Sequence, residues 1–238
     1  MIKRQIARVM GMTLNGVKLS PQFEGKSGFI FDEVEQRLAV GDYSFGSEIS
    51  NIELVKEFGA SRAPVTMALN LLQAAGYLTI KPQVGVRVSS PTDEEIIFYF
   101  QIHAKEESVQ ASLAAQRSTP EMVAILVLIL DKLENVRDGT HSLRDQLALG
   151  GLFHSQIRLM AGMQWFSRQT ASAWRMSNFL IANRSSKIRS AQRPDENKLR
   201  GEIIASIREN LPARAAELME EFVTCRCALD RSGIHSHN

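Results

Sequence analysis

The feature that most constrains the fold of this chain is a helix–turn–helix pattern that begins near residue 51. Apolar residues recur at helical spacing in two segments, and Gly59 and Ala60 lie in the turn between them. Ser61 is a suitable N-cap for the second helix, and Pro64 falls in its first turn, where a backbone N–H would lack a partner anyway. The residues expected to face inward are Leu54, Val55, Phe58, Val65, Ala68, Leu69 and Leu72.

Two strands are predicted directly after this pair of helices. Gly76 ends the second helix, and residues 77–80 and 86–88 form a predicted hairpin around a loop that contains Pro and Gly. Another helix is expected before the pair, over 29–40, with Phe29, Ile30, Val34 and Leu38 facing inward. This order of elements predicts a winged helix-turn-helix, a fold whose second helix enters the DNA major groove.

Several spaced residues in this segment resemble the GntR family of bacterial repressors. The matching positions are Ser61-Arg62-Ala63-Pro64-Val65, Ala68-Leu69, Leu72, Gly76-Tyr77-Leu78 and Gly85-Val86. The stretch from Gly41 to Ile49 is similar to the turn before the family's second helix, although Phe45 stands where proline is usual. The resemblance implies a dimeric winged-helix regulator with a separate effector domain behind the DNA-binding module.

The predicted reading helix and wing carry basic residues and no acidic ones. Residues 61–90 contain Arg62, Lys81 and Arg87 but neither Asp nor Glu, as expected of a surface that lies against phosphates. We expect Arg62 to contact guanine, Ala63 to touch a thymine methyl group and Gly85 to let the wing backbone approach the minor groove. The full set of expected DNA-binding residues is Ser61, Arg62, Ala63, Thr66, Lys81, Gly85 and Arg87.

Two positions depart from the family's pattern. The family usually has arginine at the position of Thr66, and often another at that of Ile52, so phosphate contacts are fewer here. A flexible basic arm over residues 1–26 could compensate by following a groove, or could have no role. The missing arginines also leave open the alternative that the winged helix binds a protein rather than DNA.

The chain of 238 residues is long enough for a second domain. Pro91 ends the last strand, and Thr92 or Asp93 caps a new helix. Helices are then predicted at 94–117, 119–139, 143–161, 165–189, 196–210 and 212–230. The expected fold is mainly α, with a flexible arm at 1–26, the winged helix at 27–90, and an all-α antiparallel bundle for effector binding and dimerisation at 91–238.

Other classes of protein are disfavoured by features that the sequence lacks. No apolar run approaches the roughly 20 residues that span a bilayer, and no signal-peptide core follows the basic N-terminus. Cys225 and Cys227 form neither a disulfide framework nor a zinc spacing. The five histidines are scattered, without a Glu-x-x-His pair or a nucleophile elbow. We therefore expect a cytoplasmic protein without membrane partners and without enzyme activity.

The helical half resembles the FCD type of effector domain, which is associated with the FadR branch of the GntR family. The matching residues are Leu113-Ala114-Ala115, Arg117-Ser118-Thr119, Phe153-His154, Ile203-Ile204, Ser206-Ile207, Ala215 and Met219. Many FCD domains bind a divalent metal through one Asp and three His, and on this chain those positions are Gly150, His154, Arg200 and Phe222. A guanidinium has no lone pair to donate and repels a cation, so we expect no metal and no other cofactor.

Arg200 suggests that an anion takes the place of the metal, since an arginine in a polar cavity can bind a carboxylate through two hydrogen bonds. We expect a small carboxylic acid or other anion as effector, with His154 donating a second hydrogen bond. The expected effector-binding residues are His103, His154, Arg158 and Arg200. Three alternatives remain open. Arg200 could face solvent or pair with Glu196, His154 could be an interior hydrogen-bonded histidine, and Phe222 could line an apolar cavity for an acyl chain.

Overall fold

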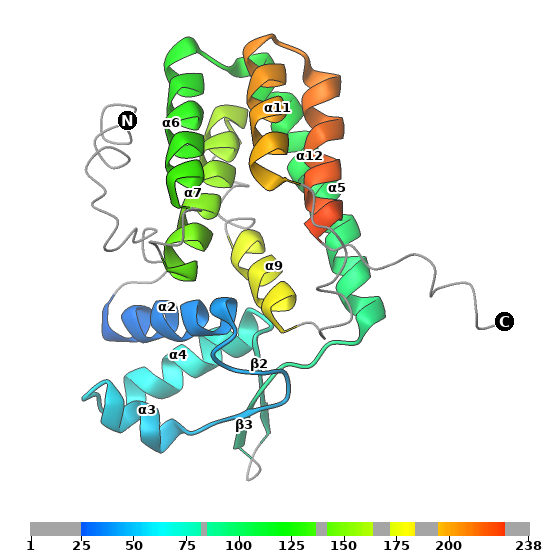
Figure 1. Ribbon diagram of the computed structural model, residues 1–238. Helices are drawn as coiled ribbons and strands as arrows, with labels where there is room; N and C mark the ends of the chain where they lie inside the picture. The colour runs from blue at the N-terminus through cyan, green and yellow to red at the C-terminus, as the bar shows by residue number, and fades with distance from the viewer. Residues whose placement is uncertain (1–24, 82–84, 137–141, 164–171, 184–194, 227–238) are drawn as a thin grey trace, which may run out of the picture. The chain divides into compact units, whose positions relative to one another are not determined.

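The computed structural model describes residues 25–81, 85–136, 142–163, 172–183 and 195–226. Within these residues the chain divides into two compact units (Figure 1). The N-terminal unit contains the described residues up to Asp93 together with Arg175–Asn183, and the helical unit contains the described residues of Glu94–Trp174 and of the chain after Arg184.

The N-terminal unit has three helices of its own and a small antiparallel sheet. The helices are α2 (Gly25–Val40), α3 (Asn51–Glu57) and α4 (Arg62–Ala74). The sheet has the order β1-β3-β2, with β1 at Glu48–Ile49, β2 at Leu78–Lys81 and β3 at Gly85–Val88. This is the winged helix-turn-helix that the sequence predicts, and its core is made by Ile30, Phe31, Val34, Leu38, Leu54, Val65, Ala68, Leu69 and Leu72.

Local signals explain where these helices begin and end. The Ser50 hydroxyl accepts a hydrogen bond from the backbone N–H of Glu53 and caps α3. Gly59 (φ +52°) and Gly76 (φ +87°) follow α3 and α4 with positive φ, which an L side chain rarely adopts. The two glycines thus turn the chain first into α4 and then into the hairpin.

Two details of the N-terminal unit differ from the prediction. Phe29 was expected to face inward, but its side chain is 53% exposed and contacts the edge of the Phe58 ring, while Phe31 is buried instead. Helix α2 begins earlier than predicted, and its inward line passes through Ile30, Phe31 and Val34. Strand β1 was not predicted, because a strand of two residues gives no alternating pattern.

A helix from far along the chain completes this unit. Helix α9 spans Ala173–Ala182, so the helix predicted over 165–189 is wrong in its extent among the described residues. From Arg175 onward α9 belongs to the N-terminal unit, where Arg175 Nε lies 2.8 Å from Glu35 Oε2. Glu35 is buried, and its other oxygen accepts a hydrogen bond from the Tyr77 hydroxyl at 2.9 Å.

Aromatic and polar contacts strengthen the attachment of α9 to the same unit. The Phe179 ring meets the rings of Phe45 and Tyr77 edge to face, each with centroids 5.3 Å apart. Just beyond the helix, the Asn183 side chain accepts a hydrogen bond from the backbone N–H of Phe45 at 3.0 Å. Phe45, which stands where the family usually has proline, therefore contacts α9 through its ring and the residue after α9 through its backbone N–H.

The helical unit is built from long helices. They are α5 (Asp93–Arg117), α6 (Pro120–Val136), α7 (Leu143–Ala161), α11 (Glu196–Arg208) and α12 (Pro212–Arg226). In Figure 1, α6 lies beside α7 and α11 lies beside α12. The predicted ends at 137–139 and 227–230 lie outside the described residues. None of the described helices is long and apolar enough to cross a membrane.

Caps fix the ends of the helices that carry the polar site. Ser142 and Asp145 form a capping box at the start of α7, and Gly162 ends this helix in the left-handed conformation. The Asp195 side chain accepts hydrogen bonds from the backbone of Asn197 and Lys198 and caps α11. Glu196 and Arg200 therefore lie in the first turns of α11, and Arg158 lies in the last turn of α7.

Candidate functional site

Helix α4 presents to solvent a face of mostly polar or small residues, with Met67 as its one large apolar side chain, and an apolar face to the core. Val65, Ala68, Leu69 and Leu72 are buried. The exposed residues are Arg62, Ala63, Thr66, Met67, Asn70, Gln73 and Ala74, and no acidic residue is among them. A helix with these properties can lie against DNA phosphates without like-charge repulsion.

The start of α4 is available for an anion. Ser61 occupies the N-cap position, but its side chain makes no capping hydrogen bond, and the residue is exposed. The first turn of α4 contains no acidic residue. Because backbone N–H groups and the helix dipole both favour negative charge at this end, a phosphate fits here chemically.

The wing residues are exposed, but one of them is engaged within the fold. Lys81 pairs in register with Gly85 at the end of the hairpin, next to residues 82–84 outside the described part. Arg87 forms an ion pair with Glu48 of β1 and donates a hydrogen bond to the carbonyl of Gly46 at 3.3 Å. Since β1 was not predicted, this partial neutralisation of Arg87 was missed by the sequence reasoning.

A second candidate site lies inside the helical unit, around Glu107 of α5. Glu107 is fully buried, and its two oxygens lie 2.7 Å from Nδ1 of His154 and 3.1 Å from a terminal nitrogen of Arg158, both on α7. His103, one turn before Glu107, is also buried. Three of the predicted effector-binding residues are thus gathered around a carboxylate that was not predicted.

Glu107 was missed because a lone Glu on a helix is usually solvent-exposed. The signal that could have found it is its position. It falls four residues after His103 and on the same line as the buried residues Phe100, Ala104 and Ala111. An acid in the inward phase of a helix needs a cationic or hydrogen-bonded partner, which the sequence supplies on α7.

The cluster has a definite protonation pattern. Burial would raise the pKa of Glu107, but His154, Arg158 and His103 outweigh this effect and lower its pKa to about 2. Burial lowers the pKa of His154, and lowers that of His103 to about 4. The lowered pKa values favour neutral imidazoles near neutral pH, where Glu107 is kept ionised by Arg158 and by the hydrogen bond with His154.

This pattern decides the tautomer of His154. An ionised carboxylate only accepts hydrogen bonds, so Nδ1 of His154 donates to Glu107 and Nε2 is left as an acceptor. Nε2 is buried and has no hydrogen-bond partner in the described part of the chain; the same holds for both ring nitrogens of His103. The expected role of His154 as a hydrogen-bond donor to the effector therefore does not apply to this tautomer, because its one N–H faces Glu107.

The side chain of Trp174 occupies the place of the family's first metal ligand. A Cβ added to Gly150 would lie 2.5 Å from Cζ2 of Trp174. The indole stacks on the His154 imidazole at 4.2 Å and donates a hydrogen bond to the Leu147 carbonyl at 3.0 Å. Phe222 also faces this imidazole, with centroids 5.5 Å apart.

These residues do not fit a divalent metal ion. His154 is the one donor left from the family's set, and its Nδ1 is bound to Glu107. Within the described ranges no group of three or more His, Cys, Asp or Glu side chains is placed to hold a metal. Borderline metals need three or four such donors, so the chemistry of this site is that of a hydrogen-bonded polar cluster.

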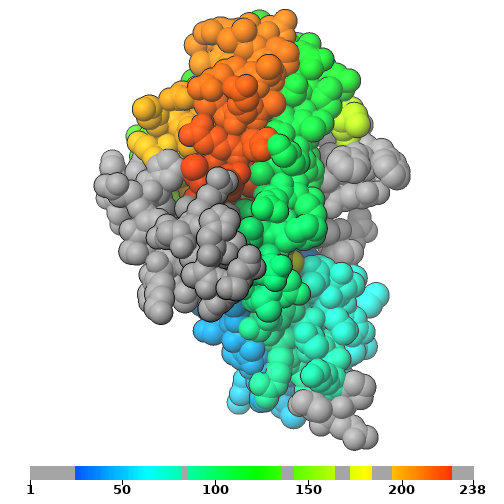
Figure 2. Space-filling view, turned by 90° about the vertical axis from the view of Figure 1, so that its right-hand side faces the viewer, coloured from blue at the N-terminus to red at the C-terminus, as the bar shows by residue number. Residues whose placement is uncertain are grey.

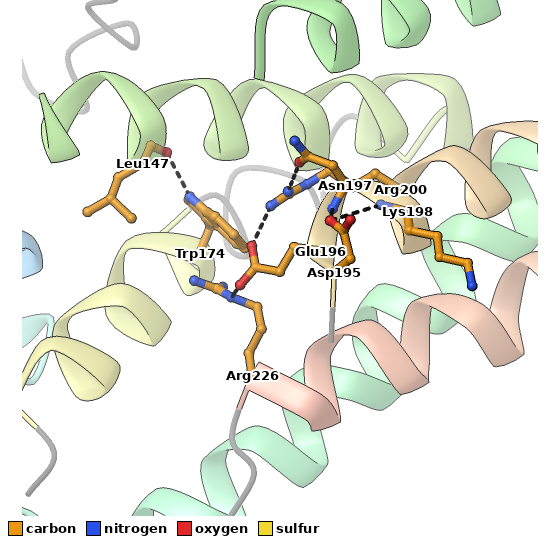
Figure 3. A network of polar contacts seen from close by, with 8 residues as sticks. All are labelled: Leu147, Trp174, Asp195, Glu196, Asn197, Lys198, Arg200 and Arg226. Carbon is orange, nitrogen blue, oxygen red and sulfur yellow. Dashed lines mark hydrogen bonds and ion pairs between the residues drawn. The ribbon is translucent and has the colours of Figure 1, made fainter. Parts of the chain in front are cut away.

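Arg200 belongs to a neighbouring network (Figure 3). Figure 3 shows the Glu196 carboxylate between two guanidinium groups. Its oxygens lie 2.9 Å from a terminal nitrogen of Arg200 and 3.5 Å from Nε of Arg226. Arg200 is 4% exposed and also donates to the Asn197 side chain at 2.7 Å. Of the alternatives for Arg200, pairing with Glu196 is thus present, and the side chain is buried rather than solvent-facing.

Aromatic rings connect the two polar groups. The Arg226 guanidinium lies 3.9 Å from the centre of a Trp174 ring, so the indole is contacted by both His154 and Arg226. Arg200 lies 4.8 Å from the centre of the Phe222 ring, which itself meets His154. Arg226 and Trp174 were not predicted as site residues, because only their packing against His154 and Glu196 brings them into the site.

Comparisons with known proteins agree with both halves of this description. Residues 26–88 match the family described as bacterial regulatory proteins, gntR family, and residues 104–224 match the FCD domain. The chain is 30% identical over 112 residues to the nta operon transcriptional regulator of Aminobacter aminovorans, an alignment that covers 47% of this chain and 52% of that protein. It is 25% identical over 128 residues to the uncharacterized HTH-type transcriptional regulator YdhC of Bacillus subtilis, covering 53% and 57%.

This chain spans little more than half the length of these two relatives. Among solved structures, E. coli McbR/YncC is similar, with a TM-score of 0.71 at 17% identity over 84% of this chain and 94% of that one. At this identity the likeness shows the fold. The matched families and relatives are transcriptional regulators rather than enzymes.

Proposed function

Because the chain belongs to the GntR family of bacterial regulatory proteins and carries an FCD domain, we propose that it is a repressor that binds an inverted-repeat operator as a homodimer. DNA binding is assigned to residues 27–90, and effector binding and dimerisation are assigned to residues 91–238. The observation that supports this assignment best is the exposed, acid-free face of α4 beside a hairpin wing. An effector in the helical unit would change operator affinity by favouring one arrangement of the two reading heads.

Arg62 is the proposed base-reading residue. It is exposed at the start of α4, and an arginine there can bridge O6 and N7 of guanine. Arg62→Ala should lower operator affinity by about 1–3 kcal/mol and leave the fold intact. DNA selected from a random duplex library and tested by gel shift with a polyanionic competitor measures this loss.

Arg208→Ala is the matched control, since Arg208 is an exposed arginine at the end of α11 in the other unit. It should bind DNA like the wild type. Unchanged binding by the Arg62 variant would remove this contact from the proposal. Failure to select any sequence would favour the alternative, a winged helix that binds a protein partner.

The proposed effector is a small carboxylic acid bound without a metal. The guanidinium groups of Arg200 and Arg226 lie over the Phe222 and Trp174 rings beside His154, and the buried Arg158 reaches Glu107, the partner of His154. Guanidinium is the side chain best suited to a carboxylate. Nε2 of His154 is a buried acceptor without a partner among the described residues, so a ligand that also carries a donor such as a hydroxyl group is favoured. His103, with two buried ring nitrogens, is assigned to the same ligand.

A thermal-shift screen tests the effector class. Carboxylic acids with and without a hydroxyl group are compared with fatty acyl compounds, on the wild type and on Arg200→Lys. The lysine variant keeps the positive charge but cannot form the bidentate hydrogen bonds of a guanidinium, so stabilisation by carboxylates should weaken. Stabilisation by acyl compounds alone would favour the alternative of an apolar ligand, which the rings of Phe153, Trp174 and Phe222 around His154 also suit.

A further inference from the structure

Helix α4 carries a large apolar side chain midway along its exposed face. Met67 is 54% exposed, and it lies on one helical line with Ala63 and Asn70, four residues before and three after. This line is opposite the buried line of Val65 and Leu72. Met67 therefore contributes little to the core of the unit, and its side chain lies midway along the surface that is proposed to face DNA.

The residues around Met67 let the helix approach the base edges closely. Ala63, Thr66 and Ala74 are exposed and short, so no long side chain on these positions holds the helix away. Where the family usually has arginine, Thr66 offers a hydroxyl and a methyl group. Contacts at the centre of this face are therefore those of small and apolar groups, with Arg62 near one end and Asn70 toward the other.

The major groove displays one kind of apolar group, the 5-methyl group of thymine. Methionine is unbranched and polarizable, and it adapts its shape to such a surface. Asn70 is one helical turn further along, and an asparagine amide can bond N6 and N7 of adenine. A thymine beside Met67 and an adenine beside Asn70 are thus complementary to the same line of the helix.

We propose that Met67 and Asn70 select A·T base pairs within each half-site, with the Met67 side chain packed against a thymine methyl group and the Asn70 amide bonded to adenine. This inference rests on the proposed DNA-binding function. It adds two specificity-determining residues to Arg62, and it explains why an exposed methionine stands at the centre of a reading helix.

Replacement of thymine by deoxyuridine tests the proposal, since this change removes the methyl group and leaves base pairing intact. A duplex is first selected from a random library by the full-length protein, and each thymine of one half-site is then replaced singly. At one position the wild type should lose about fourfold in affinity, as expected for one buried methyl group. Met67→Ala should bind the thymine and deoxyuridine duplexes equally at that position, whereas Met67→Leu should retain part of the difference.

Met163→Ala is the matched control, because Met163 is 45% exposed but lies after α7 in the helical unit. It should keep the full sensitivity to deoxyuridine. Asn70→Ala should also keep the sensitivity to deoxyuridine. It should lose the preference for adenine at the base that Asn70 contacts. The inference on Met67 is overturned if the wild type is insensitive to every replacement, or if Met67→Ala keeps the same sensitivity. Absence of any selected sequence would instead overturn the DNA-binding function itself.

Discussion

Gly150 has no side chain because the indole of Trp174 fills the space above it. A methyl group there would lie 2.5 Å from the ring, which is held by the His154 stack and by a hydrogen bond to Leu147. Gly150→Ala should therefore displace Trp174 and destabilise the helical unit by about 1–3 kcal/mol, which urea denaturation measures. The fluorescence of Trp174 should shift to the red as its ring becomes exposed.

A second helical glycine provides the control for this substitution. A methyl group on Gly201 of α11 would meet Leu130 at 3.8 Å, an ordinary contact distance. Gly201→Ala should therefore stabilise the protein by about 0.5–1 kcal/mol, since alanine is the better helix former. Equal effects of the two substitutions would show that Trp174 does not pack tightly on Gly150.

At the same scale, the sequence could identify His103, His154, Arg158 and Arg200 as polar residues on helices but not their partners. Glu107, Trp174 and Arg226 acquire their roles through contacts between helices that are distant in the chain. Periodicity says which face of a helix is buried, and it does not say which residue of another helix meets that face. The partners of a buried charge therefore required the structure.

At the scale of elements, helices with a clear apolar period and good caps were predicted closely. Leu143–Ala161 has a capping box at its start and a left-handed glycine after its end, and both bounds agree with the prediction. Strand β1 was not predicted, and helix α9 was predicted with the wrong extent, for different physical reasons. The first is too short to show alternation, and the second owes its place to Glu35 and Phe45, more than 130 residues away.

The burial of Glu35, which faces Arg175 of α9, should make the stability of the N-terminal unit depend on pH. Burial raises the pKa of Glu35 to about 7, from 4.5 in the unfolded chain. Between these values the folded protein binds the extra proton, so Glu35 should reduce stability as pH rises from 4.5 to 7, by about 3 kcal/mol. Glu35→Gln removes this dependence, because glutamine does not ionise.

The measurement is the free energy of unfolding of the wild type and of Glu35→Gln at pH 5 and pH 8. The change between the two pH values is then compared between the two proteins. Tyr77 can still donate its hydrogen bond to the glutamine oxygen, so the two proteins should be similar at pH 5. At pH 8 the wild type should have lost more stability than the variant. An equal loss in both would mean that Glu35 does not titrate in this range.

At the scale of the whole molecule, the proposed inverted-repeat operator would need two reading heads, and we expect the two chains of the proposed homodimer to pair through α5. Phe98, Ile102 and Val109 are 62%, 56% and 58% exposed and fall within a narrow arc of this helix. Figure 2 shows α5, in green, at the molecular surface beside α12, with which it is linked by the ion pair of Lys105 and Glu220. An apolar line of this kind is self-complementary when two copies meet about a two-fold axis.

Ile102→Asp should convert the proposed homodimer to a monomer, because it places two like charges near each other in an apolar contact. Sedimentation equilibrium should show the change in mass, while circular dichroism remains that of the folded protein. Operator affinity should fall by roughly 100-fold or more, since each head then binds its half-site alone. Val127→Asp on α6, where Val127 is 46% exposed, is the control that should remain dimeric and bind normally. A dimeric Ile102→Asp protein would place the contact between the two chains on another surface.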